Sequence, residues 1–158
     1  MSVAFRRESD EEHLEPKFEL PIPPGPNLVT ARGLRLIRAA LAAREAALAA
    51  ATDEEQRKQI GRELRYWGTR AATAQLAPVP DGTVVAFGTR VGFRLNGAER
   101  QVDLVGDDEA EPAAGRIAFS APLARALMGA EPGDLADFGG KPDAIEILAT
   151  AVIPDDVD

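Results

Sequence analysis

The sequence contains no cysteine and a single histidine, His13. Without cysteine, the chain has no disulfides, no thiolate metal ligands and no cysteine nucleophile. A lone histidine in a polar, proline-rich stretch excludes a histidine-based catalytic triad or a His-rich metal site within the fold. A phosphate-binding P-loop and a dinucleotide glycine motif are also absent. The sequence thus argues against several common classes of enzyme.

Long apolar runs and aromatic residues are also scarce. Aromatic residues make up 5% of the 158 residues, and no apolar run is long enough to span a bilayer. The charged N-terminal residues lack the apolar core of a signal peptide. We therefore expect a soluble, cytoplasmic protein that is not embedded in a membrane.

The net charge of −8 is unevenly distributed, with −3 over residues 1–28, +4 over 29–80 and −9 over 81–158. The overall negative charge argues against extensive wrapping of nucleic acid, which needs many cations to neutralise phosphates. A basic segment in an acidic protein suggests that this segment enters a negatively charged or RNA-containing environment. An ordinary solvated helix that carries arginines is the alternative.

Residues 29–78 predict an antiparallel helical hairpin, a short coiled coil. Helices are expected over 30–51 and 53–77, because apolar residues recur there at three- and four-residue steps. Thr52 followed by Glu55 is a capping-box pattern and predicts the start of the second helix. The apolar stripes are formed by Leu34, Ile37, Leu41 and Leu48, then Ile60, Leu64, Trp67, Ala71 and Ala74.

Residues 81–153 predict a mainly antiparallel sheet with one short helix over 122–128. Asn96-Gly97 is a strong hairpin signal, because both residues tolerate positive φ. Residues 1–28 and 154–158 are expected to be a disordered proline-rich arm and an acidic tail. The fold class is therefore α+β. The expected strands are Thr83–Phe87, Thr89–Leu95, Arg100–Val105, Arg116–Ser120, Leu135–Phe138 and Ala144–Ile153.

Three motifs follow one another in the C-terminal half of the chain. They are Leu104-Val105-Gly106-Asp107-Asp108-Glu109-Ala110, Phe119-Ser120-Ala121-Pro122-Leu123-Ala124-Arg125-Ala126-Leu127-Met128-Gly129, and Pro132-Gly133-Asp134. Their order and spacing resemble the C-terminal domain of the GreA/GreB transcript-cleavage factors. Asn27-Leu28-Val29-Thr30-Ala31-Arg32-Gly33-Leu34 is similar to that family's entry into its first long helix. The resemblance implies an FKBP-like C-terminal domain behind a short helical hairpin.

The resemblance also implies a function without an autonomous active site. Such a factor binds the rim of the RNA polymerase secondary channel and inserts its hairpin toward the catalytic centre. Tip carboxylates then share a magnesium ion with the polymerase, which cleaves backtracked RNA. The candidates here are Asp53, Glu54 and Glu55, and the helix dipole is an alternative reason for acidic residues in a first turn. No cofactor is expected on the chain alone, and a monomer suits insertion into a channel.

Two further groups of residues are candidates for contacts. The family segment associated with polymerase binding corresponds here to Ser120, Pro122, Leu123 and Arg125, with Leu127 expected in the core. Basic residues of the second helix are candidates for contact with RNA, including a nascent 3′ end, or with acidic channel walls. These are Arg57, Lys58, Arg62 and Arg65, and a solvated face is their alternative.

Two other clusters have structural interpretations. The acidic group Asp107, Asp108, Glu109 and Glu111 lacks the glycine-centred pattern of a calcium loop, which favours a turn between strands. Tyr66 and Trp67 could stack on nucleic acid bases. Because Trp67 falls on the apolar stripe, a place in the hairpin core is favoured.

Two alternatives to transcript cleavage stay open. A helix over 30–51 extends about 33 Å, shorter than in typical cleavage factors, and the family's acidic tip pattern is absent. A non-cleaving channel regulator that competes with longer Gre factors, similar to Rnk-type proteins, is therefore the first alternative. The second is a peptidyl-prolyl isomerase, because FKBP-like folds include such enzymes, although few aromatics are available for a proline pocket.

Overall fold

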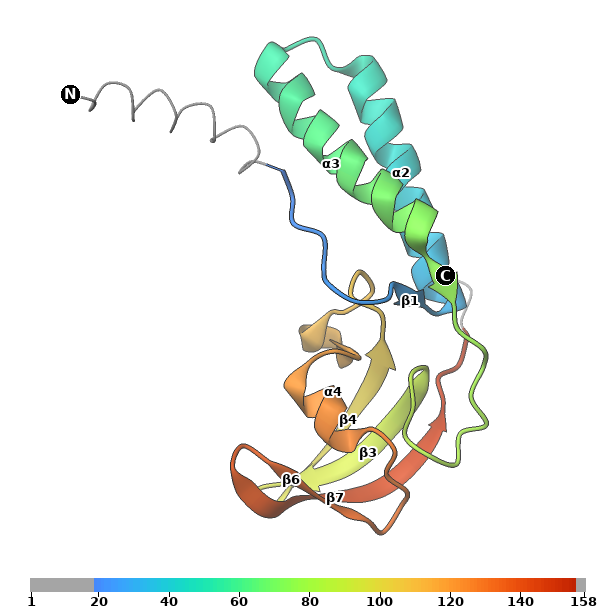
Figure 1. Ribbon diagram of the computed structural model, residues 1–158, viewed down its shortest axis with the longest axis vertical. Coiled ribbons are helices and arrows are strands. Elements are labelled where there is room, and N and C mark those ends of the chain that lie inside the picture. Colours follow the sequence, from blue (N-terminus) through green and yellow to red (C-terminus); the bar gives the residue numbers. More distant parts are fainter. Residues whose placement is uncertain (1–18, 156–158) are drawn as a thin grey trace, which may run out of the picture. The chain divides into compact units, whose positions relative to one another are not determined.

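The computed structural model describes residues 19–155 (Figure 1). His13 and the part of the predicted arm within 1–18 lie outside the described residues, as does the part of the predicted acidic tail within 156–158. No helix in the described part of the chain is long and apolar enough to cross a membrane.

The described residues form two compact units. The hairpin unit contains residues 19–25 and Ile37–Thr73, and the body unit contains Pro26–Leu36 and residues 74–155. The body unit is therefore discontinuous in sequence, because the hairpin is inserted between its two segments.

Two helices of 20 residues each, α2 (Ala31–Ala50) and α3 (Glu54–Thr73), form the helical hairpin (Figure 1). Alanine, leucine and arginine, which dominate α2, have high helix propensities. Ile60 of α3 is buried in the hairpin, and Arg44 of α2 donates a 2.7 Å hydrogen bond to Glu63 of α3. The predicted antiparallel hairpin is confirmed.

The turn between the helices differs from the predicted capping box. The helix begins at Glu54, and the Asp53 carboxylate accepts a 2.9 Å hydrogen bond from the backbone N–H of Gln56. Asp53 therefore caps α3, so the predicted role of Thr52 is wrong. Aspartate and threonine are both good N-caps, so the sequence alone does not decide between the adjacent residues Thr52 and Asp53.

A two-stranded parallel ladder joins the chain on either side of the hairpin. In it, β1 (Leu28–Val29) pairs with β2 (Gln75–Leu76). The backbone N–H of Gln75 donates to the carbonyl of Asn27 at 2.8 Å, and that of Ala77 donates to the carbonyl of Val29 at 3.0 Å. Because residues 75–77 are used in this ladder, α3 ends at Thr73 and not at the predicted residue 77.

The body unit is built on a five-stranded sheet in the order β5-β4-β3-β7-β6. Its pairs are antiparallel except β4 with β5, which is parallel. Asn96 and Gly97 both have positive φ, 54° and 80°, in the turn between β3 and β4, as a type I′ turn requires. The strands are β3 (Thr89–Leu95), β4 (Ala98–Val105), β5 (Arg116–Ala118), β6 (Leu135–Phe138) and β7 (Lys141–Val152).

One predicted strand, Thr83–Phe87, is wrong. This segment is not part of the sheet, but its backbone pairs with the chain just after α4 (Pro122–Leu127). Val85 donates to the carbonyl of Ala130 and accepts from the N–H of Gly129, both at 2.8 Å. The apolar run thus buries Val85 without strand pairing.

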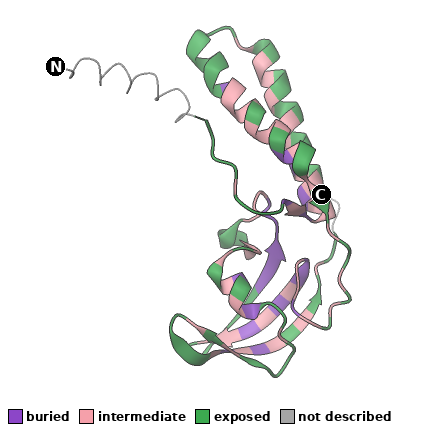
Figure 2. Ribbon diagram, in the orientation of Figure 1, coloured by how far each residue is buried: buried purple, intermediate pink, exposed green. Residues whose placement is uncertain are grey.

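The core of the body unit lies between the sheet and α4 (Figure 2). Ala124 and Leu127 of α4 are fully buried against it, which confirms the predicted core position of Leu127. A short 3-10 helix, η1 (Pro112–Ala114), precedes β5. The buried apolar residues of this core are Val85, Val91, Phe93, Val102, Leu104, Ala124, Leu127, Ile145 and Ile147. The predicted α+β architecture, helices followed by a mostly antiparallel sheet, is confirmed.

Candidate functional site

The outer side of α4 carries the residues expected to bind a partner. Pro122 occupies the first turn of α4 and is exposed, as suits a residue without a backbone donor. Arg125 is exposed, and its Nε donates a 3.2 Å hydrogen bond to the carbonyl of Ser120. Leu123 is only half-buried and packs against the core, while Met128 is 40% exposed. We call Ser120, Pro122, Arg125 and Met128 the α4 face.

The α4 face is fixed to the acidic turn that follows β4. The Ser120 hydroxyl donates a 3.1 Å hydrogen bond to Asp107. Since Arg125 in turn contacts the carbonyl of Ser120, the polar half of the α4 face is held by side-chain contacts as well as by the helix. Arg125 lies three residues from both Pro122 and Met128, so the structure presents a cation between two exposed apolar side chains. Methionine and arginine are both enriched at protein interfaces.

Glu109, in the same acidic turn, is buried and contacts the start of α2. Its carboxylate accepts a 2.6 Å hydrogen bond from the Thr30 hydroxyl and a 3.3 Å one from Arg32. The Thr30 hydroxyl also accepts from the backbone N–H of Gly33 at 3.0 Å, so Thr30 caps the helix. The negative charge lies where the helix dipole favours it. Glu109 is thus a structural residue, as expected for a turn.

Two glycines permit this close packing. A Cβ at Gly33 would lie 2.8 Å from Oε1 of Glu109, and one at Gly106 would lie 2.3 Å from the carbonyl oxygen of Leu28. The segments 27–34 and 104–110, which carry two of the sequence motifs, therefore touch in the folded body unit. Sequence reasoning identified the motifs but missed the contact, for which these glycines were the available signal.

The hairpin tip carries the three predicted carboxylates, all exposed. Asp53 is engaged as the α3 cap, whereas Glu54 and Glu55 lie in the first turn of α3. Negative charge in this turn is stabilised by the helix dipole. The structure accordingly separates Asp53, which has a structural role, from Glu54 and Glu55.

The described residues of the tip do not form a complete metal site. Within residues 19–155, no group of three or more histidine, cysteine, aspartate or glutamate side chains is arranged to hold a metal ion. Carboxylate oxygens are suitable magnesium ligands, but within residues 19–155 Glu54 and Glu55 do not belong to a group of three such side chains.

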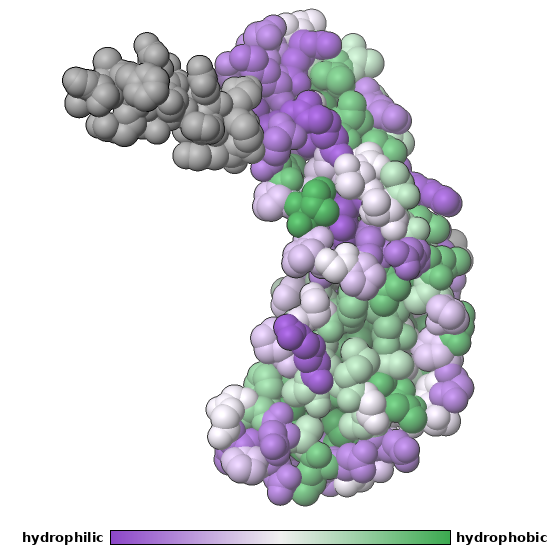
Figure 3. All heavy atoms as spheres, viewed as in Figure 1, coloured by the Kyte–Doolittle hydropathy of each residue, from purple (hydrophilic) through white to green (hydrophobic). Residues whose placement is uncertain are grey.

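The four predicted basic residues differ in their surroundings. Arg57 donates to the carbonyls of Leu48 and Ala51 at 2.9 and 3.0 Å, and so caps the end of α2. Arg62 donates to Gln59, and Arg65 pairs with Glu19. Lys58 is exposed. Hydrophilic side chains gather over the tip half of α3 (Figure 3), and contact with RNA or channel walls stays a prediction.

The aromatic pair of α3 lies beside these residues. The Tyr66 and Trp67 rings meet edge to face, with centroids 5.0 Å apart. Both side chains are half-buried, so neither offers a fully open face for base stacking.

A shallow cleft of about 170 Å³ lies within the body unit. Its lining is mostly apolar and includes Leu76, Val79, Val152 and Ile153, with Phe87 as the sole aromatic residue of the described chain that lines it. Among the described residues, the cleft therefore lacks the several aromatic side chains expected of a peptidyl-prolyl isomerase pocket.

The comparisons with known proteins agree with the sequence motifs. Residues 80–150 match the family model described as "Transcription elongation factor, GreA/GreB, C-term". The chain is 38% identical over 105 residues to transcription elongation factor GreA of Sinorhizobium medicae (strain WSM419), covering 63% of this chain and 66% of that protein. GreA of Agrobacterium fabrum (strain C58) is 37% identical with the same coverage. The chain thus spans just under two thirds of these relatives.

Solved structures that the chain matches include GreA factor homolog 1 of Thermus thermophilus, with 16% identity, a TM-score of 0.36, and coverage of 80% of this chain and 99% of that one. A GreA/GreB structure from Nitrosomonas europaea gives 18% identity, a TM-score of 0.38, and coverage of 81% and 99%. By the sequence matches, residues 80–150 form a C-terminal domain of the GreA/GreB family.

Proposed function

We propose that this chain binds RNA polymerase through the α4 face and acts at its secondary channel. The observation that carries the proposal is the α4 face itself, in which Arg125 contacts Ser120 and lies between the exposed side chains of Pro122 and Met128 along the helix. This surface lies inside the region that matches the family model. Arginine is among the residue types that most often contribute a large share of the binding energy at interfaces.

Binding to core RNA polymerase tests the proposal directly. Arg125→Glu reverses the charge of the α4 face, and we expect it to weaken binding by about ten- to a hundredfold, as for an interface arginine worth ~1.4–2.8 kcal/mol. Lys141→Glu is the matched control, because Lys141 is an exposed cation of the same unit on β7. Circular dichroism verifies that both variants fold. Equal binding by Arg125→Glu and the unaltered chain would refute the role of the α4 face.

We propose further that Glu54 and Glu55 are the carboxylates through which the hairpin assists cleavage of backtracked RNA by the polymerase. Both are exposed at the tip, whereas Asp53 already caps α3. Any magnesium ion there is shared with the polymerase, and the RNA 3′ end is the nucleic acid that the tip approaches. The catalytic machinery belongs to the polymerase in this proposal.

A cleavage assay on a stalled complex with extruded RNA separates this role from that of a channel regulator. We expect Glu54→Gln/Glu55→Gln to abolish stimulated cleavage and to retain polymerase binding. Glu45→Gln, on an exposed position of α2, is the control for charge. Binding without any cleavage by the unaltered chain, together with inhibition of a longer Gre factor, would favour the non-cleaving regulator, for which the 20-residue helices are the supporting observation.

A further inference from the structure

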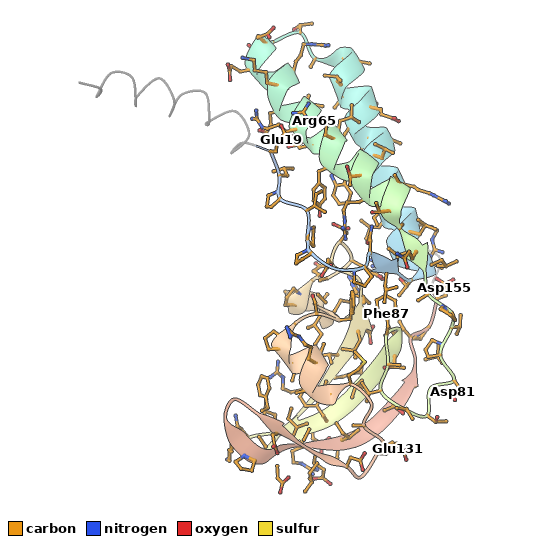
Figure 4. The ribbon with its side chains drawn as sticks, in the orientation of Figure 1. Glu19, Arg65, Asp81, Phe87, Glu131 and Asp155 are labelled. Atoms are coloured by element: carbon orange, nitrogen blue, oxygen red, sulfur yellow. The ribbon has the colours of Figure 1, made fainter. Side chains whose placement is uncertain are left out.

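Glu19 forms a two-pronged ion pair with the exposed side of α3. Nε of Arg65 donates to one carboxylate oxygen at 2.9 Å, and its terminal nitrogen donates to the other at 2.5 Å. Figure 4 shows the two side chains pointing toward one another. This is the fork geometry in which an arginine binds carboxylates or phosphates. Glu19 therefore already binds Arg65, the arginine that we expect to contact an anionic partner.

Arg62 adds a second positive charge to the same place. The pKa of Glu19 is lowered, chiefly by its hydrogen bond from Arg65. Desolvation opposes this shift, and attraction to Arg65 and Arg62 adds to it. Lys58, Arg62 and Arg65 follow one another at four- and three-residue steps and so share one side of α3. We call these three residues the cationic row.

The charges of the two segments are complementary. Residues 1–25 contain six acidic and three basic residues, and α3 contains five basic and three acidic residues. Opposite net charges of this kind attract over several ångströms and lose strength as salt screens them.

The ion pair between Glu19 and Arg65 is exposed and should be readily reversible. Leu20 and Ile22, apolar side chains near Glu19, are 37% and 45% exposed, so neither is buried as a core side chain would be. Exposed ion pairs are weak on their own and compete with solvent ions. A polyanion that engages all three cations would therefore displace a single carboxylate.

We propose that Glu19 is an intramolecular acidic ligand that occupies Arg65 of the cationic row and competes there with the phosphates of RNA. The inference deepens the proposed function and rests on it for the identity of the partner. A phosphate backbone carries closely repeated charges that match a row of three cations, which favours it over an isolated carboxylate of a protein wall. The Glu19 contact then raises the RNA concentration that is needed for binding to the hairpin.

Fluorescence anisotropy with a labelled single-stranded RNA of about 12 nucleotides, a length chosen to span one binding groove, tests the competition in the full chain. We expect Glu19→Gln to bind this probe about two- to fivefold more tightly, as release of one exposed ion pair allows. Glu45→Gln removes the same charge from α2 and should leave affinity nearly unchanged. The difference between the variants should shrink with added NaCl.

Arg65→Gln provides the second arm of the experiment. It should weaken RNA binding and make affinity insensitive to Glu19→Gln, because the competition is then removed. Equal affinities of Glu19→Gln and Glu45→Gln would overturn the proposal. If an oligoglutamate probe gains affinity in Glu19→Gln while RNA does not, the assignment to RNA is refuted in favour of an acidic protein segment. The assay contains no polymerase, so its failure is distinct from failure of the α4 face to bind polymerase.

Discussion

The contact between Glu109 and the start of α2 gives the most demanding prediction about the body unit. The substitution Glu109→Ala removes a hydrogen bond between a hydroxyl and a buried carboxylate, for which ~1.5–3 kcal/mol is typical. It also removes a charge from the α2 N-terminus, which contributes about 0.3–1 kcal/mol. The longer Arg32 contact, 3.3 Å with Arg32 partly exposed, adds little. We therefore expect a loss of about 3 kcal/mol in the free energy of unfolding.

Urea and thermal unfolding followed by circular dichroism measure this loss. For a chain of this length, about 3 kcal/mol lowers Tm by roughly 6–12 °C. Hydrogen exchange gives a local measurement, because the N–H of Gly33 donates to Thr30 and should lose protection in the variant. Glu111→Ala is the control, since Glu111 is an exposed carboxylate in the same turn, paired with Arg116, and should change stability by under ~1 kcal/mol.

Glu109 and Thr30 should also be energetically coupled, because their side chains are in direct contact. Thr30→Val removes the hydroxyl that Glu109 contacts, so the effects of the two substitutions should be strongly non-additive. Additive losses, or a Glu109→Ala effect no greater than that of Glu111→Ala, would refute the view that this carboxylate fixes the start of the helix.

Three other predictions concern the body unit and the hairpin. Gly106→Ala should destabilise the protein by about 1–3 kcal/mol, because its Cβ would collide with the Leu28 carbonyl; unchanged urea unfolding would contradict this. Glu63 has a pKa lowered chiefly by its hydrogen bond from Arg44. Its stabilising contribution should be present above the ordinary glutamate pKa and disappear as pH falls through the lowered value, and Glu63→Gln should remove that pH dependence in thermal unfolding. Arg57→Ala should speed amide exchange at the hairpin turn, because Arg57 caps the end of α2, whereas Lys58→Ala should not.

Much of the fold was predictable because its signals are local. The helices of the hairpin follow from helix-forming residues, and the β3–β4 turn follows from Asn96-Gly97, whose positive φ values are a property of those two residues. β6 spans the four predicted residues. By contrast, β1 and β2 have two residues each, too few for a hydrophobic period, and arise only when distant parts of the chain meet.

The candidate site was less predictable for a related reason. Residue types indicated which side chains could bind, but their intramolecular partners are remote in sequence. Glu19 meets Arg65, and Glu109 meets Thr30, across separations of 46 and 79 residues. No local sequence pattern shows that an arginine already binds a carboxylate. The sequence therefore predicted the same role for Arg65, which pairs with Glu19, and for the exposed Lys58. The three motifs, in contrast, located the α4 face because it is continuous in sequence.

The β1–β2 ladder has a consequence for how such proteins can diversify. It places Leu28 beside Gln75, so the chain leaves the body and returns to it at neighbouring points. Whole helical turns could then be added to or removed from both arms together while the body keeps its own hydrogen bonds and core. The length of the hairpin can therefore change between related proteins that retain the same body unit.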